Sequence, residues 1–191
     1  WEESLGSRNE SHPEREPKDV ATVARMWESE LDKAGIEKAV FFTNMEEDDE
    51  VGRFTAIKPE RFIGYGTFNP TLPGKAGMLK DQIERDRIRG LKFYPMAQGF
   101  RINDPACFPV FEVCGEHNLA VLIHFGLSIN ATHDLSYGNP LDLATPALMF
   151  PAVNWIIPHF GTGFFREALL LAAQYKNVFI DTSSSNNWTR Y

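Results

Sequence analysis

The chain has 191 residues, of which 43% are hydrophobic and 24% charged, a composition typical of one globular domain with a real core. A net charge of -7 disfavours a general affinity for nucleic acid or anionic membranes. No window approaches the ~18 apolar residues of a membrane span and no signal peptide is evident, so we expect a cytoplasmic protein. The expected partners are a small-molecule substrate and a second copy of the chain in a homodimer.

Strand and helix patterns alternate along the chain. Residues 1–17 are polar and lack periodicity, which predicts a loop or mobile segment. The predicted elements that follow are, in order, a helix from Val20 to Ala34, a strand over 36–42, a helix over 48–57, a strand over 61–68, a helix over 74–87, a strand over 89–95, a helix through Phe108, Phe111 and Cys114, a strand over 119–125, a helix over 140–149, a strand over 153–160, a helix over 164–175 and a strand over 177–183.

The predicted strands are apolar nearly throughout, which indicates burial on both faces and a parallel sheet covered by helices. Such a sheet is either open and doubly wound or part of a (β/α)8 TIM-type barrel. No glycine-rich phosphate loop follows the first strand, as a doubly wound nucleotide-binding sheet would favour. Chemically active side chains instead end several strands, which is typical of a barrel. The sequence therefore predicts a single α/β domain over residues 1–191 with a barrel architecture.

Two histidines end two successive predicted strands and are the leading site candidates. His124 follows the apolar run of residues 121–123, and His159 follows that of residues 155–158. For His124 the alternatives are a metal ligand and a core histidine bonded to a backbone carbonyl. For His159 they are a second metal ligand, a general acid or base, and a donor to developing negative charge. We expect the ring nitrogens of this pair to lie within roughly 8 Å of each other at one barrel mouth.

Asp181 ends the last predicted strand and is a candidate catalytic carboxylate. It would accept a proton, hold a histidine ring or bind a metal ion, or else cap the turn formed by residues 182–185. The sequence leaves these alternatives open.

Four further side chains are candidates for substrate binding. Lys92, inside an apolar strand, would either pair with a carboxylate in the barrel mouth or extend its ammonium group to solvent. Tyr94 ends the same strand. Arg101 would clamp a substrate carboxylate or form a surface ion pair, and His133 would either reach the site from a long loop or remain solvated.

The two cysteines, Cys107 and Cys114, lie seven residues apart on a predicted helix. Both fit its buried side, so we expect inert core thiols rather than a disulfide framework or a reactive site.

In sequence order, several segments resemble the amidohydrolase-related (amidohydrolase 2) family, the branch of the metal-dependent hydrolases with aminocarboxymuconate-semialdehyde decarboxylase and gamma-resorcylate decarboxylase. The segments are GIEKAVFF, PERFIGYGTFNP, RGLKFYP, FPVFEVCGEHNLAVLIHFG, FPAVNWIIPHFGTGF and KNVFIDTSS. The resemblance implies a barrel with one divalent metal ion, zinc or else manganese, at its mouth. It implies that His124, as the fifth-strand histidine, binds the metal and that His159, as the sixth-strand histidine, is catalytic or a second metal-site residue.

The sequence also departs from the pattern of this family. Tyr94 stands where relatives often have a histidine, no His-x-His pair occurs in residues 1–35, and no metal-binding aspartate in a GSDYP-like context is present. Six strands with His124 at the fifth position correspond to strands two to seven, which predicts an incomplete barrel without its first and last strands. Asp181 would then end the seventh strand, and the metal would be absent if the chain is truncated.

The resemblance implies a metal-dependent hydrolase that acts on a small carboxylated or cyclic substrate through metal-activated water. The alternative on the same scaffold is a nonoxidative decarboxylase. A further alternative is a non-catalytic barrel or fragment with an incomplete metal site, because a catalytic zinc ion needs about three protein ligands.

Overall fold

The computed structural model describes residues 19–42, 50–85, 88–128 and 131–184. The predicted loop over residues 1–17 lies outside these ranges, as does the start of the helix expected over 48–57.

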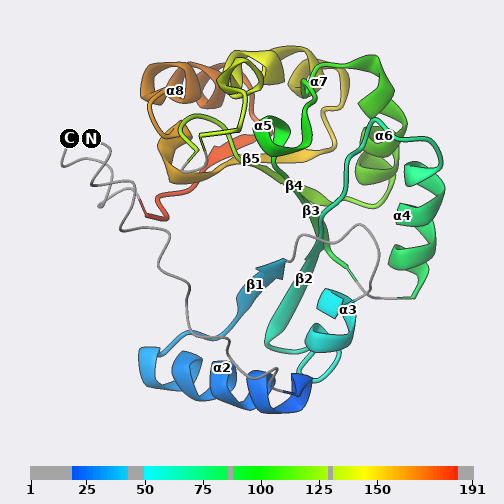
Figure 1. Cartoon of the computed structure of the whole chain (residues 1–191), viewed down its shortest axis with the longest axis vertical. Coiled ribbons are helices and arrows are strands. Elements are labelled where there is room, and N and C mark those ends of the chain that lie inside the picture. The colour runs from blue at the N-terminus through cyan, green and yellow to red at the C-terminus, as the bar shows by residue number, and fades with distance from the viewer. Residues whose placement is uncertain (1–18, 43–49, 86–87, 129–130, 185–191) are drawn as a thin grey trace.

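Six parallel strands form one sheet (Figure 1). Their bounds are β1 Ala39–Phe42, β2 Phe62–Gly66, β3 Gly90–Phe93, β4 Ala120–Ile123, β5 Asn154–Ile157 and β6 Val178–Ile180. The spatial order equals the sequence order, whereas a doubly wound sheet reverses direction at a switch point. The sheet is therefore an arc of a (β/α)8 barrel, which confirms the predicted fold class.

Helices precede β1 and connect successive strands, and the longer helices cover the outer face of this arc (Figure 1). Their bounds are α2 Val20–Ala34, α3 Glu50–Thr55, α4 Lys75–Glu84, α5 Pro95–Gln98, α6 Phe108–Glu116, α7 Ala144–Met149 and α8 Phe165–Gln174. Short 3-10 turns complete the connections, namely η2 Pro105–Cys107, η3 Leu135–Tyr137, η4 Pro140–Leu143 and η5 Pro158–Gly161.

Local sequence signals explain the boundaries of α2. Asp19 caps its start, because the Asp19 carboxylate accepts a hydrogen bond from the Thr22 backbone N–H at 2.9 Å. Gly35 ends the helix with a left-handed φ of 65°, a conformation that glycine adopts without strain.

Proline makes two strands shorter than the sequence pattern suggested. β3 ends at Phe93 and β5 at Ile157, because Pro95 and Pro158 lack the N–H that would continue the ladder and instead begin helical turns. Tyr94 and His159 consequently lie just beyond their strands. The single helix expected over 140–149 is also divided, into η4 and α7.

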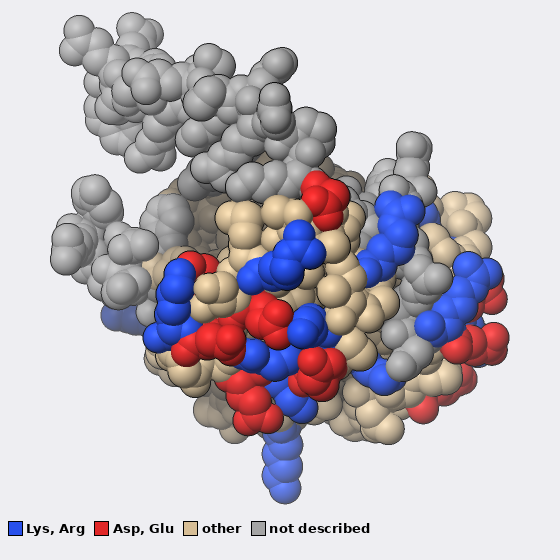
Figure 2. Space-filling model, turned by 90° about the horizontal axis from the view of Figure 1, so that it is seen from below, with Lys and Arg blue, Asp and Glu red and all other residues tan. Residues whose placement is uncertain are grey.

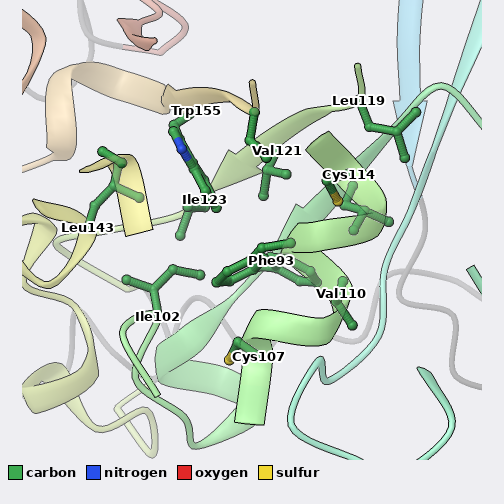
Figure 3. Packing of buried hydrophobic residues seen from close by; sticks show 14 of the residues in the cluster. Phe93, Ile102, Cys107, Val110, Cys114, Leu119, Val121, Ile123, Leu143 and Trp155 are labelled. Carbon is green, nitrogen blue, oxygen red and sulfur yellow. The ribbon is translucent and has the colours of Figure 1, made fainter. Parts of the chain in front are cut away.

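The main hydrophobic core lies between the outer face of the sheet and the helices (Figure 3). The rings of Phe111 and Trp155 meet edge to face with centroids 4.9 Å apart, so α6 is held against β5. Cys107 and Cys114 are free and buried in this core, and burial raises the pKa of each thiol to about 12. The prediction of inert core thiols is confirmed.

The inner face of the sheet is only partly covered. Val40 and Phe42 of β1 are 42% and 39% exposed, and Phe179 of β6 is 48% exposed. The expectation of strands buried on both faces was therefore wrong for these two strands. Within the described residues they are the edges of the sheet, and their inward-facing side chains have no opposite wall.

Charged side chains of both signs intermingle on the face seen in Figure 2. The ion pairs Arg61–Asp32 at 2.6 Å and Lys58–Glu28 at 2.8 Å join α2 to the chain before β2. This face has no continuous basic surface of the kind that binds nucleic acid. Among the described residues, no helix has the length and apolar character needed to cross a bilayer.

Candidate metal and substrate site

A cavity of about 320 Å³ opens at the carboxyl ends of the strands. Its lining residues are Tyr94, Met96, Ala97, His124, Leu127, Ser128, His133, His159 and Ser184. The rings of His124 and His159 have centroids 5.4 Å apart and cross at 67°, which agrees with the predicted proximity of their nitrogens. Two strand ends that are 35 residues apart in sequence therefore form one site.

The protonation of His124 is set by its surroundings. Its Nε2 lies 3.1 Å from the carbonyl oxygen of Leu127, which only accepts hydrogen bonds, so Nε2 carries the proton and Nδ1 keeps its lone pair. Burial, with the nearby Lys92 ammonium, lowers the pKa of His124 to about 4. The ring is therefore neutral near pH 7, the form that binds metal ions.

His159 is bonded to the chain through its other ring nitrogen. Its Nδ1 lies 2.8 Å from the carbonyl oxygen of Ser183 and donates to it, which leaves Nε2 as the nitrogen for another partner. The backbone here is unusual, because His159 and Phe160 have φ values of 57° and 53°, in the left-handed region that non-glycine residues seldom occupy. Such strain is typical of functional sites.

The histidine pair fits a divalent metal ion. Two imidazoles bound tetrahedrally to one ion, with Zn–N of about 2.0–2.1 Å, would place their ring centroids about 5 Å apart, close to the observed value. Each ring also donates its other nitrogen to a backbone carbonyl, the second contact that usually orients metal-binding histidines. The described residues contain no group of three or more histidine, cysteine or acidic side chains that would hold a metal ion, so this pair is a partial ligand set.

Asp181 shapes the turn that carries His159. Its Oδ1 accepts hydrogen bonds from the backbone N–H of His159 at 3.1 Å and of Ser183 at 2.8 Å, and from the Ser183 hydroxyl. Burial opposes ionisation of this carboxyl, but these donors outweigh it and lower its pKa below the usual value. Of the alternatives open from sequence, the structure shows the cap, while the catalytic role of Asp181 stays a prediction.

Two substitutions separate these roles of Asp181 in the full-length protein. Asp181→Ala removes the acceptor of three hydrogen bonds and is expected to destabilise the protein by about 2–3 kcal/mol. Asp181→Asn keeps an acceptor oxygen, so we expect it to lose about 1 kcal/mol and to retain most activity. Urea unfolding and turnover measure both effects. If Asp181→Asn were well folded but as inactive as Asp181→Ala, the carboxylate would be a proton acceptor in the reaction.

Lys92 is more deeply buried than expected. Its side chain lies on the inner face of β3 and is 2% exposed, so the interpretation of an ammonium group reaching solvent was wrong. It forms no ion pair with a described carboxylate either. Its Nζ instead lies 4.6 Å from the ring centroid of Tyr94 and 5.6 Å from that of Phe42. Burial lowers the pKa of Lys92 to about 7, although the Asp181 carboxylate partly opposes the shift.

Tyr94 and His133 line the cavity, and their contact with a substrate stays a prediction. The ring of Tyr94 lies between Phe42, at 6.5 Å, and His124, at 5.9 Å. The backbone N–H of Tyr94 donates to the side-chain oxygen of Gln98, which fixes α5 at the rim of the cavity. The Nδ1 of His133 lies 2.6 Å from the hydroxyl of Ser128.

Arg101 does not line this cavity. It forms the surface ion pair that was the other alternative from sequence, with Asp142 at 2.8 Å, and its guanidinium group lies over the ring of Tyr137. Its contacts hold the loop after β4 against the segment after α5. Its proposed contact with a substrate stays a prediction.

Sequence reasoning missed several contributors to the site. Ser128 and the Leu127 carbonyl belong to an irregular loop, where no periodicity identifies them. Ser183 follows Asp181 closely and was noticed only as part of a turn, although that closeness was a usable signal. Met96 supplies an apolar wall from α5, a helix that the sequence pattern did not predict.

Gly126 joins the loop of His124 to the turn of His159. With a φ of 83°, it sits so close to the η5 turn that an added Cβ would lie 2.0 Å from the Thr162 carbonyl oxygen. The Leu127 N–H donates to that same carbonyl at 2.9 Å. The close approach of the two histidine-bearing segments therefore requires glycine at this position.

We expect Gly126→Ala to destabilise the full-length protein by at least about 3 kcal/mol, because backbone strain adds to a collision with backbone atoms. Gly163→Ala is the matched control, since Gly163 also has a positive φ of 94° but has open space around it. This control should lose about 1–2 kcal/mol. Urea unfolding compares the two, and equal losses would contradict the close packing of the two segments.

Parallel strands in sequential order, with two imidazoles at their carboxyl ends, define a partial (β/α)8 barrel with a candidate metal site. The chain belongs to the amidohydrolase family, because the family model Amidohydro_2, described as amidohydrolase, matches residues 3–191. No curated protein matches the chain significantly.

Solved structures support the barrel. An uncharacterized TIM-barrel protein from Bordetella bronchiseptica aligns with a TM-score of 0.67 and 20% identity, over 83% of this chain and 58% of its own. A probable 2-pyrone-4,6-dicarboxylic acid hydrolase from Acinetobacter baumannii, with citric acid bound, aligns with a TM-score of 0.64 and 14% identity, over 86% of this chain and 61% of its own. A 5-carboxyvanillate decarboxylase from Novosphingobium aromaticivorans, complexed with manganese and 4-hydroxy-3-methoxy-5-nitrobenzoic acid, aligns with a TM-score of 0.58 and 18% identity, over 88% of this chain and 63% of its own. The chain thus spans about three fifths of the length of these structures.

Proposed function

We propose that this protein is a metal-dependent hydrolase that acts on a small carboxylated or cyclic substrate. The observation that carries the proposal is the arrangement of His124 and His159, two imidazoles whose ring centroids lie 5.4 Å apart in one shared cavity and which each bond one ring nitrogen to a backbone carbonyl. Membership in the amidohydrolase family and the manganese in a structural neighbour favour a divalent ion at this place, zinc or manganese.

The residues of this chain would bind the ion and position the substrate. His124 Nδ1 and His159 Nε2 would be two of the ligands, held in orientation by the carbonyl groups of Leu127 and Ser183. A bound divalent ion supplies Lewis-acid activation of water or of a substrate oxygen. Tyr94, Met96 and Leu127 offer a largely apolar wall for a small ring.

A carboxylated substrate suits the charge of this site. The ammonium of Lys92 lies behind the ring of Tyr94 in a nearly dry environment, where an electrostatic attraction is weakly screened. It would favour an anionic substrate in the cavity without a direct contact, because Lys92 is not among the lining residues.

Nonoxidative decarboxylation on the same scaffold is the second candidate. The neighbour that decarboxylates 5-carboxyvanillate favours it, and the site would then orient a carboxylate without activating water. The incomplete ligand set among the described residues favours the third possibility, a non-catalytic barrel. Assembly as a homodimer also stays a proposal, which sedimentation would test.

One experiment distinguishes these functions. The full-length gene product, stripped of metal and reloaded with zinc or manganese, is given 2-pyrone-4,6-dicarboxylic acid and, separately, 5-carboxyvanillate. Ring opening of the first without CO2 release supports the hydrolase, whereas CO2 release from the second supports the decarboxylase. The metal-stripped protein is the control and should be inactive. A folded full-length protein that binds neither zinc nor manganese would support the third possibility, a non-catalytic barrel.

A further inference from the structure

The side chain of Met96 forms part of the cavity wall although it is only 4% exposed. Its far side lies against the loop after β4, because a Cβ added to Gly138 would be 2.6 Å from Met96 Sδ. Gly138 is not among the lining residues, so Met96 separates it from the cavity. Resting on the function proposed above, we propose that Met96 sets the size limit of the substrate and restricts it to acids with a single ring.

The cavity is small enough for such a limit to matter. Its volume of about 320 Å³ is at the lower end of the range of roughly 300–1,000 Å³ that is typical of small-molecule sites. Among the described apolar lining residues, Ala97 contributes only a methyl group and Leu127 is 45% exposed. Tyr94 has aromatic neighbours on two sides. Met96 is therefore the buried aliphatic side chain whose length decides how far a ring can enter.

The helix that carries Met96 is fixed at the rim. The backbone N–H of Tyr94 donates to the side-chain oxygen of Gln98 at 3.0 Å, and the Asn69 side-chain amide donates to the Gln98 carbonyl at 3.1 Å. These bonds tie α5 to the end of β3 and to the segment after β2. Met96 consequently extends from a fixed backbone, and only its side chain can yield to a ligand.

The surface behind Met96 is fixed as well. The Gly138 N–H donates to the Leu135 carbonyl, and the Gly138 carbonyl accepts from the Gly126 N–H, both at 2.9 Å. α5 also packs against η3, which ends next to Gly138. The thioether cannot move back into this surface, so a ring that is too large for the cavity meets a wall with backbone behind it.

Gly138 offers a way to push Met96 without changing it. Gly138 has a φ of -94°, which alanine adopts without strain, so Gly138→Ala leaves the backbone in place. The new Cβ would collide with Met96 Sδ, the flexible end of an unbranched side chain that can change rotamer. Because Gly138 lies on the side of Met96 away from the cavity, the displaced thioether moves into the cavity and narrows it.

The first test measures binding of two acids to the metal-loaded full-length protein by calorimetry. The single-ring probe is 4-hydroxy-3-methoxy-5-nitrobenzoic acid, and the fused two-ring probe is 1-hydroxy-2-naphthoic acid. Wild type should bind the single-ring acid at least about 10-fold more tightly. Met96→Ala should bind the two-ring acid about 10–100-fold more tightly than wild type does. Met96→Leu, which keeps the volume, should retain the wild-type preference.

Met26→Ala is the matched control, since Met26 lies on α2 and is 48% exposed, and it should bind both acids as wild type does. Met96→Val removes less of the side chain and replaces Met96→Ala if that variant does not fold. Unchanged affinity for the two-ring acid in a folded Met96→Ala or Met96→Val protein would overturn the proposal. So would a wild type that binds metal but neither acid.

The second test is a double-mutant cycle. Gly138→Ala alone should weaken binding of the single-ring acid by about 10-fold, whereas in the Met96→Ala background it should have almost no effect. Gly77→Ala in α4 is the control, because an added Cβ there meets open space. Equal weakening by Gly138→Ala in both backgrounds would show that Met96 does not transmit the effect, and would overturn the proposal.

A third measurement needs neither substrate nor metal. In protein labelled with [methyl-13C]methionine, the Met96 signal is the one that Met96→Leu lacks. Gly138→Ala should shift this signal and leave that of Met26 in place, whereas Gly77→Ala should shift neither. A Met96 signal unmoved by Gly138→Ala would overturn the proposed wall. Failure of the proposed function appears separately, as absence of zinc or manganese binding by wild type, and this signal still decides the placement of Met96.

Discussion

Replacing His124 with alanine in the full-length protein should remove the bound metal ion and nearly all activity while the fold survives. Loss of a residue that only hydrogen-bonds to a metal ligand weakens metal binding by about 10–100-fold. Loss of a ligand itself should therefore weaken metal binding by more than about 100-fold. The folded protein loses little, because the ring makes one hydrogen bond to the chain, to the Leu127 carbonyl, worth about 1 kcal/mol. Elemental analysis of the purified protein measures the metal, and circular dichroism checks the fold.

His117→Ala is the matched control, since His117 is exposed and lies away from the cavity. It should retain metal and activity. Unchanged metal content in a folded His124→Ala protein would restore the alternative interpretation of His124 as a core histidine bonded to a carbonyl group.

The second large effect concerns Lys92, whose replacement by methionine should stabilise the protein at low pH. The pKa of this amine falls from 10.5 to about 7 on folding. Above about pH 10.5 the amine is neutral in both states and has no effect on stability. As the pH falls from 10.5 to 7, the unfolded chain binds the proton more readily, so stability declines, and below pH 7 the full penalty is present.

Lys92→Met keeps the volume and removes the ammonium group. At 1.36 kcal/mol per pKa unit the penalty is several kcal/mol, and the contacts with Tyr94 and Phe42 offset about 1–2 kcal/mol of it. The stability advantage of Lys92→Met over wild type should therefore shrink by about 3 kcal/mol between pH 6 and pH 10. Urea unfolding at both pH values measures it.

Lys80→Met is the control for Lys92→Met, because Lys80 is half exposed and forms only a surface ion pair with Glu116. Its effect on stability should be within about 1 kcal/mol at both pH values. A pH-independent effect of Lys92→Met would show that Lys92 stays protonated in the folded protein, with a partner outside the described residues.

The sequence by itself determined the order of the elements and the architecture. Apolar runs such as residues 121–123 and 155–157 present apolar side chains to both faces of a strand, so the sequence alone predicts buried strands there. His124 and His159 each end such a run, and parallel strands carry their carboxyl ends to the same edge, which made their meeting predictable. Proline sharpened the strand ends in ways that the pattern of apolar residues did not anticipate.

Only the tertiary structure decided what each polar side chain does at that edge. The tautomers of His124 and His159 depend on carbonyl groups of Leu127 and Ser183, which the chain brings near through irregular loops. Whether Lys92 reaches solvent depends on the rings of Phe42, at the end of β1, and Tyr94, just beyond β3. The contacts of His159 with Ser183 and of Lys92 with Phe42 join segments far apart in sequence, and the contact of His124 with Leu127 depends on an irregular loop, so no local periodicity encodes them. The apolar pattern reports only which face is buried, and long-range packing sets the partner, the charge state and the direction of each buried polar group.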